Sequence, residues 1–291
     1  MDLRLGLHVS IEGELDEAFD RAASKGCNCM QLFTRNPRSW NHKPLDEKVV
    51  ECFIFKLRTT NIQPVFVHMP YLPNLASAKK DVYEKSVESL ARELDRCAQL
   101  EIPYLVTHLG SSLGSGKSVG TARITNAVNT AFSHSRGEVI LLLENTAGSK
   151  NSVGSTFEDI RRVIEGISDE VRVGVCLDTC HAFAAGYDLA TYEGLRRTLQ
   201  RFEQVIGLRR LKLVHLNDSK GGLRSGWDRH EHIGLGKIGE KGFVNILNSA
   251  LGERPLILET PIDETRSDIE NLEKVIALFD GSARARSAGG L

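Results

Sequence analysis

Side chains that can bind metal ions stand at the ends of seven short apolar runs. Each run has four to six residues, mostly Val, Ile, Leu or Phe. In chain order the runs end at His8, His68, His108, Glu144, Asp178, His215 and Glu259. Imidazole and carboxylate together suit zinc, with manganese or iron an option where carboxylates dominate. One histidine at a strand end is usually a hydrogen-bonded core residue, but seven such endings predict a site for several metal ions.

The apolar runs have the length of buried parallel strands and are too short for helices. Eight strands are expected near residues 3–9, 29–34, 64–69, 104–109, 139–145, 172–178, 211–217 and 255–260. Amphipathic helical stretches follow them near residues 14–25, 46–60, 79–100, 118–135, 156–167, 191–206, 241–251 and 266–279. Strict alternation of strand and helix predicts one parallel α/β domain. In a closed ring of such strands the C-terminal ends share one face, so the candidate ligands would meet in one pocket.

The composition is that of a water-soluble chain with enough apolar residues for a core. Hydrophobic residues make up 41% and charged residues 26%, and the mean hydropathy is −0.21. The length of 291 residues fits one (β/α)8 domain, which usually has about 250 residues. No apolar stretch approaches the roughly 20 residues that span a bilayer. The N-terminus lacks the pattern of a secretory signal, so we expect an intracellular protein without a membrane partner.

Two of the six cysteines lie beside a candidate ligand. Cys176 and Cys180 flank Asp178, where their thiolates would be soft metal ligands. The alternative, which we favour, is that both are small buried residues packed in the wall of the site. The spacing of the cysteines does not indicate a disulfide framework.

Two glycine-rich segments resemble phosphate-binding loops but lack the required context. In GSSLGSGKS (110–118), the first glycine of the G-x-x-x-x-G-K pattern falls on Ser111. In GLGKIG (234–239), the spacing fits a dinucleotide fingerprint, but a polar segment precedes it where a strand is needed. We therefore expect both segments to be loops over the pocket.

Two further segments place ligand-type side chains close together. In CLDTCH, His181 follows Asp178 by three residues, as the chain leaves a strand. In DRH, His230 follows Asp228 by two residues. These pairs make a third metal ion plausible.

The chain resembles the endonuclease IV family of apurinic/apyrimidinic (AP) endonucleases. The matching segments are QLFTRNPRSW (31–40), LVTHLGS (105–111), LLLENTAG (141–148), GVCLDTCHAFAAGYD (174–188), VHLNDSKG (214–221) and DRHEHIGLGKIG (228–239). The resemblance runs from LHVS at the N-terminus to LILET near residue 260, almost the whole chain. It implies an α/β fold of the (β/α)8 TIM-barrel type, with the metal site at the C-terminal ends of the strands.

The resemblance also assigns the candidate ligands to three zinc ions. The first ion would be bound by His68, His108 and Glu144. Glu144 would bridge to a second ion, completed by Asp178, His215 and Glu259. The third ion would be bound by His181, Asp228 and His230. His8 is expected to support a ligand rather than to bind a metal itself.

The reaction that the resemblance implies is hydrolysis of the phosphodiester 5′ to an abasic site, as in base excision repair. It leaves a 3′-hydroxyl and a 5′-deoxyribose phosphate, and the enzyme would also remove 3′-blocking groups. The ions joined by Glu144 would activate the attacking water, which Glu259 would orient, and the third ion would stabilise the leaving oxygen. Three divalent ions and four carboxylates leave about two positive charges for a phosphate, although the chain has a net charge of −1.

The expected partner is double-stranded DNA that contains abasic sites, bound by a monomer. By family resemblance, Arg38 in TRNPRSW (34–40) and Tyr71 and Leu72 in PYLPNL (70–75) enter the minor groove. They would fill the gap that the flipped abasic nucleotide leaves. Taken alone, such a loop is usually a solvated connection with one anchoring aromatic residue.

Two rival functions are weighed against the nuclease. A metal-dependent sugar isomerase or epimerase has a similar barrel, but it needs one or two metals and gives His181, Asp228 and His230 no role. A DNA-binding or metal-binding protein without catalysis would not need a complete ligand set. We expect a barrel domain at 1–280 and a flexible tail at 281–291. A prokaryotic protein would be cytoplasmic and nucleoid-associated, and a eukaryotic one nuclear or mitochondrial.

Overall fold

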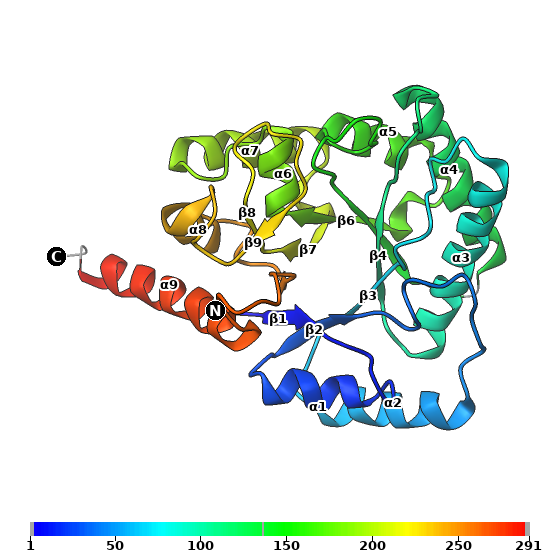
Figure 1. Cartoon of the computed structure of the whole chain (residues 1–291), viewed down its shortest axis with the longest axis horizontal. Helices are drawn as coiled ribbons and strands as arrows, with labels where there is room; N and C mark the ends of the chain where they lie inside the picture. Colours follow the sequence, from blue (N-terminus) through cyan, green and yellow to red (C-terminus); the bar gives the residue numbers. More distant parts are fainter. Residues whose placement is uncertain (1–2, 136, 289–291) are drawn as a thin grey trace.

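The apolar runs form the eight parallel strands of a closed barrel (Figure 1). The computed structural model describes residues 3–135 and 137–288. The strands are β1 (Leu5–His8), β2 (Cys29–Leu32), β3 (Val65–His68), β4 (Tyr104–His108), β5 (Ile140–Glu144), β6 (Val173–Asp178), β7 (Leu211–His215) and β10 (Leu256–Leu258). They follow chain order around the barrel, and β1 closes it by pairing with both β2 and β10. The predicted TIM barrel is confirmed.

Helices follow the strands and cover the outside of the barrel (Figure 1). They are α1 (Glu17–Ser24), α2 (Glu47–Thr59), α3 (Lys80–Gln99), α4 (Lys117–His134), α5 (Phe157–Gly166), α7 (Tyr192–Val205), α8 (Gly239–Leu247) and α9 (Asp268–Ala288). The side chains of Asp46, Thr156 and Thr191 accept backbone hydrogen bonds at the start of α2, α5 and α7. Among the described residues, no helix combines the length and the apolar character needed to cross a membrane.

The sequence does not predict the short elements that follow β6 and β7. Helix α6 (Thr179–Ala185) begins directly after β6, and β8 (Asp218–Ser219) pairs with β9 (His230–Glu231) in a small antiparallel sheet. Two 3-10 turns, η1 (Glu170–Arg172) and η2 (Leu208–Arg210), precede β6 and β7. All are too short to show a hydrophobic period. Two of them carry candidate ligands, His181 on α6 and His230 on β9.

The last helix continues beyond the predicted end of the barrel domain. The backbone of α9 is helical as far as Ala288, so this helix includes residues 281–288 of the predicted flexible tail. Residues 289–291 lie outside the described part of the chain. Figure 1 shows the far end of α9 extending away from the barrel.

Apolar side chains fill the inside of the barrel beneath the candidate site. This interior layer consists of Cys29, Phe66, Val106, Leu142, Cys176, Leu213 and Ile257, all fully buried. On β1 the chain has Gly6, because a Cβ there would lie 1.8 Å from the backbone oxygen of Cys29. Strand residues alternate between two faces, so side chains two positions beyond this layer also point into the barrel.

Candidate metal centre

A ring of polar side chains lies two residues beyond the interior layer, at the C-terminal ends of the strands. Its members on β2 to β7 and after β10 are Gln31, His68, His108, Glu144, Asp178, His215 and Glu259. The strand register places His108 level with Glu144 on β5, and Asp178 level with His215 on β7. The strands therefore bring the predicted strand-end ligands together, as expected for the C-terminal face of a barrel.

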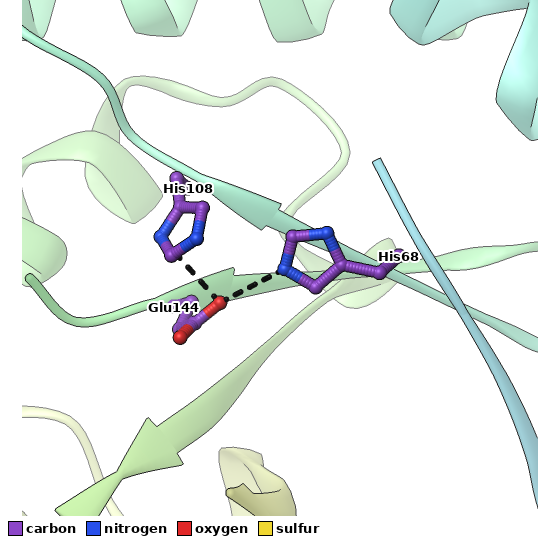
Figure 2. Close-up of side chains that lie close together, drawn as sticks. All are labelled: His68, His108 and Glu144. Atoms are coloured by element: carbon purple, nitrogen blue, oxygen red, sulfur yellow. Dashed lines mark hydrogen bonds and ion pairs between the residues drawn. The ribbon is translucent and has the colours of Figure 1, made fainter. Parts of the chain in front are cut away.

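Glu144 lies at the centre of this ring and is completely buried. Figure 2 shows His68 and His108 pointing toward the same oxygen of Glu144. Nε2 of His68 is 3.2 Å from Oε2, and Nδ1 of His108 is 3.5 Å from it. Oε1 faces the other way, 3.2 Å from Nδ1 of His181 and 3.3 Å from Nδ1 of His215. The carboxylate thus offers one oxygen to each of two groups of imidazoles, as a bridging ligand does.

The second predicted group gathers on the side of Oε1. Ligand atoms of Glu144, Asp178 and His215 all lie within 4.8 Å of one another. Oε2 of Glu259 is 3.4 Å from Nδ1 of His215, so Glu259 borders this group. Its other oxygen is 3.1 Å from Nδ1 of His8, which makes His8 a neighbour of the carboxylate, as expected.

The third predicted group lies at the rim of the pocket. Oδ1 of Asp228 is 3.1 Å from Nε2 of His181 and 3.7 Å from Nε2 of His230. His181 and His230 also cluster with Asp178, whereas Asp228 and His230 cluster with Cys180. The side chain of Asp228 is half exposed, so this group opens to solvent.

Local structure at the end of β6 explains the position of His181. Asp178 is the N-cap of α6, and its Oδ1 accepts a hydrogen bond from the backbone N–H of His181 at 2.7 Å. The three-residue spacing keeps both side chains on one side of the helix. Gly186 ends α6 in the left-handed region, with φ of 111°, and turns the chain away from the site.

Glu144, which is buried, and Glu259, which is partly buried, hold a negative charge although burial opposes it. Burial raises the pKa of Glu144, but the nearby imidazoles of His108 and His215 lower it well below its ordinary value. Burial also raises the pKa of Glu259, and His215 together with a hydrogen bond to His8 lowers it in turn. Both carboxylates therefore depend on neighbouring positive charge.

The pKa values of two histidines shift in the opposite direction, upward. Burial lowers the pKa of His181, but Asp178 and a hydrogen bond to Asp228 raise it well above its ordinary value. Burial likewise lowers the pKa of His215, and Cys176 and the adjacent glutamates raise it. The buried carboxylates attract positive charge strongly, and divalent cations in place of these protons would supply it.

Several imidazoles are oriented in the way that metal-binding histidines usually are. Nδ1 of His68 is 2.7 Å from the carbonyl oxygen of Met69, and Nδ1 of His230 is 2.9 Å from that of Glu259. Each contact leaves Nε2 facing the site, and Nε2 of His230 is buried without a hydrogen-bond partner among the described residues. Outer hydrogen bonds that fix the ring of a metal ligand are a general feature of such sites. The donor set therefore fits bound metal ions.

Three neutral amides that the sequence does not single out support the ligands. Gln31, on β2, donates to Oε1 of Glu259 at 2.7 Å, and its own Oε1 lies 2.9 Å from Nε2 of His215. Asn217 donates to Asp178 at 2.7 Å and accepts from the backbone N–H of Glu259 at 2.8 Å.

The third amide, Asn145, follows the central glutamate on β5. It exchanges two hydrogen bonds with the backbone of Asp178, which joins the ends of β5 and β6. For Gln31, the alternation of β2 is a usable signal, because it lies two residues after the inward-facing Cys29.

Both cysteines beside Asp178 are buried. Burial raises the pKa of Cys176 and of Cys180 to about 12. Cys176 belongs to the interior layer, whereas the sulfur of Cys180 lies within 4.8 Å of ligand-type atoms of Asp228 and His230. Packing in the wall of the site is the better description of Cys176.

The two glycine-rich loops have different surroundings. Gly110 and Ser111 line the cavity above the site, as expected. The segment 234–239 instead wraps around Asp218, whose carboxylate accepts backbone hydrogen bonds within this loop at 2.9–3.3 Å. A Cβ at Gly236 would lie 2.5 Å from Oδ1 of Asp218, so the loop needs glycine there.

The predicted DNA-contacting side chains lie next to the candidate metal centre. Tyr71 is 60% exposed and Leu72 37% exposed, and Arg38 is exposed as well. Phe33 packs between the centre and the loops, with ring centroids 5.8 Å from His68 and 5.1 Å from Tyr71. Burial and Glu259 raise the pKa of Tyr71, while the charge of Arg38 lowers it.

Two adjoining cavities of about 310 and 360 Å³ open above the ring. Both are lined by His68, Tyr71, His108, His181 and Asp228. The candidate metal centre is therefore accessible from the side on which the exposed side chain of Tyr71 lies. The space has the scale of a small-molecule group rather than of a duplex, which would have to rest on the rim.

Comparison with known proteins finds relatives over nearly the whole chain. Residues 19–280 match the family of xylose isomerase-like TIM barrels. A probable endonuclease 4 of Methanoculleus marisnigri is 54% identical over 273 residues, 93% of this chain and 97% of the relative. A probable endonuclease 4 of Nitrosopumilus maritimus is 47% identical over 275 residues, 94% and 98% of the two chains.

Solved structures are also similar over nearly the whole chain. Endonuclease IV from Thermus thermophilus superposes with a TM-score of 0.83 at 36% identity, covering 97% of this chain and 99% of that one. A D-tagatose 3-epimerase-like protein superposes with a TM-score of 0.71 at 16% identity, over 99% and 100% of the two chains. The second likeness shows a common fold only.

Proposed function

The chain belongs to the endonuclease IV family, and on this premise we propose that it is a metal-dependent AP endonuclease of DNA repair. Its substrate is double-stranded DNA with an abasic site. Water attacks the phosphorus 5′ to the site, the bond to the 3′ oxygen breaks, and that oxygen takes up a proton. The products are a 3′-hydroxyl and a 5′-deoxyribose phosphate. The same centre would release blocking groups from 3′ ends.

One observation carries the proposal: one oxygen of the buried Glu144 faces His68 and His108, and the other faces His181 and His215. We assign the first zinc ion to His68, His108 and Glu144. The second is assigned to Glu144, Asp178, His215 and Glu259, and the third to His181, Asp228 and His230. Manganese or iron is an alternative at one position. Without cations, four carboxylates would repel a phosphodiester.

Bound ions of this kind lower the pKa of water and neutralise the charge that develops on the phosphate. The chain's own residues would position the attacking water and the leaving oxygen. Gln31 and His8 contact one oxygen of Glu259, and the other oxygen, 3.4 Å from Nδ1 of His215, would orient the attacking water. Asp228 and His230, at the open rim, face the side from which the leaving oxygen departs.

Recognition of the abasic site is assigned to the loops after β2 and β3. Arg38, Tyr71 and Leu72 are exposed beside the cavities, where they can occupy the space of the missing base. Turning out a nucleotide without a base breaks no base pair, which favours damaged over intact DNA by a few kcal/mol. The chain is expected to act as a monomer.

Cleavage of a defined duplex tests the function. A duplex with one tetrahydrofuran abasic analogue and a 5′ label should be cut immediately 5′ to the analogue, and DNA polymerase should extend the product. An intact duplex of the same sequence is the control. Cutting on the 3′ side, equal cutting of both duplexes, or ketose epimerisation without any cutting would exclude the proposal.

A further inference from the structure

Helix α3 holds the loop that carries Arg38 through a buried network of charged side chains. Glu93 on α3 is completely buried, and both its oxygens are used. Oε2 accepts from the hydroxyl of Thr34 at 2.6 Å, and Oε1 accepts from Nε of Arg35 at 2.6 Å. One helix residue therefore binds two consecutive residues at the start of the loop.

Two arginines extend this network along the loop. Arg35 donates to the carbonyl oxygen of Ser39 at 2.7 Å and to Oγ of Ser89 on α3 at 2.8 Å. Arg96, also on α3, donates to Thr34 and to the carbonyl oxygen of Lys43 at 2.9 Å. The contacts fix the beginning, the middle and the end of residues 34–43, while Arg38 between them stays exposed.

The fixed loop also positions the second recognition loop. The backbone N–H of Tyr71 donates to the carbonyl oxygen of Pro37 at 3.0 Å. Pro37 lies inside the turn that Arg35 closes through Ser39. A shift of the first loop would therefore move the backbone of Tyr71. Helix α3 would act on Tyr71 through this loop.

Stability alone is a poor reason for such a network. Burying two guanidinium groups and one carboxylate carries a desolvation cost that apolar side chains of the same volume would avoid. What a charged network adds is a defined geometry. A loop that is ordered before the ligand arrives does not lose conformational entropy on binding, so pre-ordering strengthens the complex.

We propose that Glu93 is a positioning residue for DNA recognition, which acts through Thr34 and Arg35 to hold both recognition loops ready for damaged DNA. The inference rests on the proposed function. Glu93 has no proposed part in the chemical step, because its hydrogen bonds are with Thr34 and Arg35 of the loop. Loosening the network should therefore weaken substrate binding and leave the chemical step alone.

The test compares Glu93→Gln with Glu84→Gln in the full-length, metal-loaded protein. Glu84 is an exposed residue of the same helix, 3.8 Å from Lys80. With the abasic duplex as substrate, Glu93→Gln should raise KM about tenfold, with kcat and metal content within about twofold of wild type. Hydrogen exchange at the Tyr71 amide should accelerate. Glu84→Gln should change none of these quantities.

A second variant covers the case in which Glu93→Gln does not fold. Arg35→Lys keeps the charge but loses the planar fork that reaches Glu93, Ser39 and Ser89 together. It should show the same rise in KM and the same faster exchange. Unchanged KM with a lower Tm, or an equal loss of kcat and metal, would overturn the inference. If neither the wild type nor Glu84→Gln cuts the abasic duplex, the proposed function fails. That result is distinct from failure of the inference, in which both proteins cut the duplex.

Discussion

Gln31 and His215 share a buried contact of 2.9 Å between Oε1 and Nε2. Because an amide oxygen can only accept, Nε2 of the imidazole carries a proton, and Nδ1 is the nitrogen that would lose its proton to bind a metal ion. Nδ1 faces the carboxylates of Glu144 and Glu259, at 3.3 and 3.4 Å. A neutral side chain thus decides which nitrogen His215 presents to a metal ion.

Replacing Gln31 with leucine should therefore weaken metal binding without removing a ligand. The shape is nearly kept, but His215 and Glu259 lose their orientation, which typically costs about 10–100-fold in metal affinity. Zinc affinity is measured by competition with a chelator. Gln200→Leu, at an exposed position of α7, is the control. Equal affinities of wild type and Gln31→Leu would show that the amide has no orienting role.

Elemental analysis of the purified protein should find three ions per chain. They should resist brief chelation, because most of the ligands are buried. Glu144→Gln should lose more than one ion, since its two oxygens face different groups of imidazoles. Loss of a single ion would mean that Glu144 is a terminal ligand, and one ion or fewer in the active wild type would exclude the three-metal centre.

Glu259→Gln separates catalysis from binding. The amide keeps one oxygen but lacks the charge that orients the water, so cleavage of the abasic duplex should fall by several orders of magnitude. Affinity for the same duplex should persist, because Arg38, Tyr71 and Leu72 are unchanged. The measurements are single-turnover cleavage and equilibrium binding. Cleavage at nearly the wild-type rate would contradict the role assigned to Glu259.

Arg38→Ala and Tyr71→Ala test whether the loops recognise damage. Each variant removes a group that can occupy the space of the missing base, at about 1–3 kcal/mol for a stacking contact. Affinity for abasic duplex should drop roughly tenfold or more, and zinc content should stay unchanged. Affinity for intact duplex should change much less, since phosphate contacts dominate that complex. Equal losses on both duplexes would place discrimination in the cavity instead.

Asp218→Ala should lower stability more than any of these changes. It leaves several backbone N–H groups of residues 234–239 without their acceptor. The N–H of Ile238 is buried, and those of Gly234, Gly236 and Gly239 are partly buried. An unsatisfied buried donor costs about 1–3 kcal/mol, so a total loss of about 3 kcal/mol is expected in urea unfolding. The control is Asp280→Ala, at an exposed position of α9. A loss below about 1 kcal/mol would mean that water replaces the carboxylate.

The strand ends can be predicted from the sequence because each is an apolar run that ends in a polar residue. Each apolar run is buried on both sides, and its polar last residue stands out, as His108 and Glu144 do. Gln31 is not predicted from the ligand pattern because an amide is not among the usual zinc ligands. The sequence also does not predict helix α6, since seven residues after a strand show no period, although Asp178 and His181 stand out as ligand-type residues three positions apart.

Contacts between distant segments could not be predicted. Nothing in the sequence of α3 indicates that Glu93 meets Thr34, 59 residues away. The same holds for Asp218, whose partners follow 16–21 residues later. Such pairs depend on how the barrel places its loops, which local propensity and periodicity do not encode.

On each of seven strands, the residue of the polar ring stands two positions after the residue of the apolar layer beneath it. This spacing makes the catalytic centre sensitive to insertions and deletions in a way that substitutions do not reveal. One residue added between Val106 and His108 would turn the imidazole toward the helices, because a slip of one position exchanges the two faces of a strand. Divergence among relatives in chain length is therefore tolerable in the loops beyond the ligands, and not between the layer and the ring.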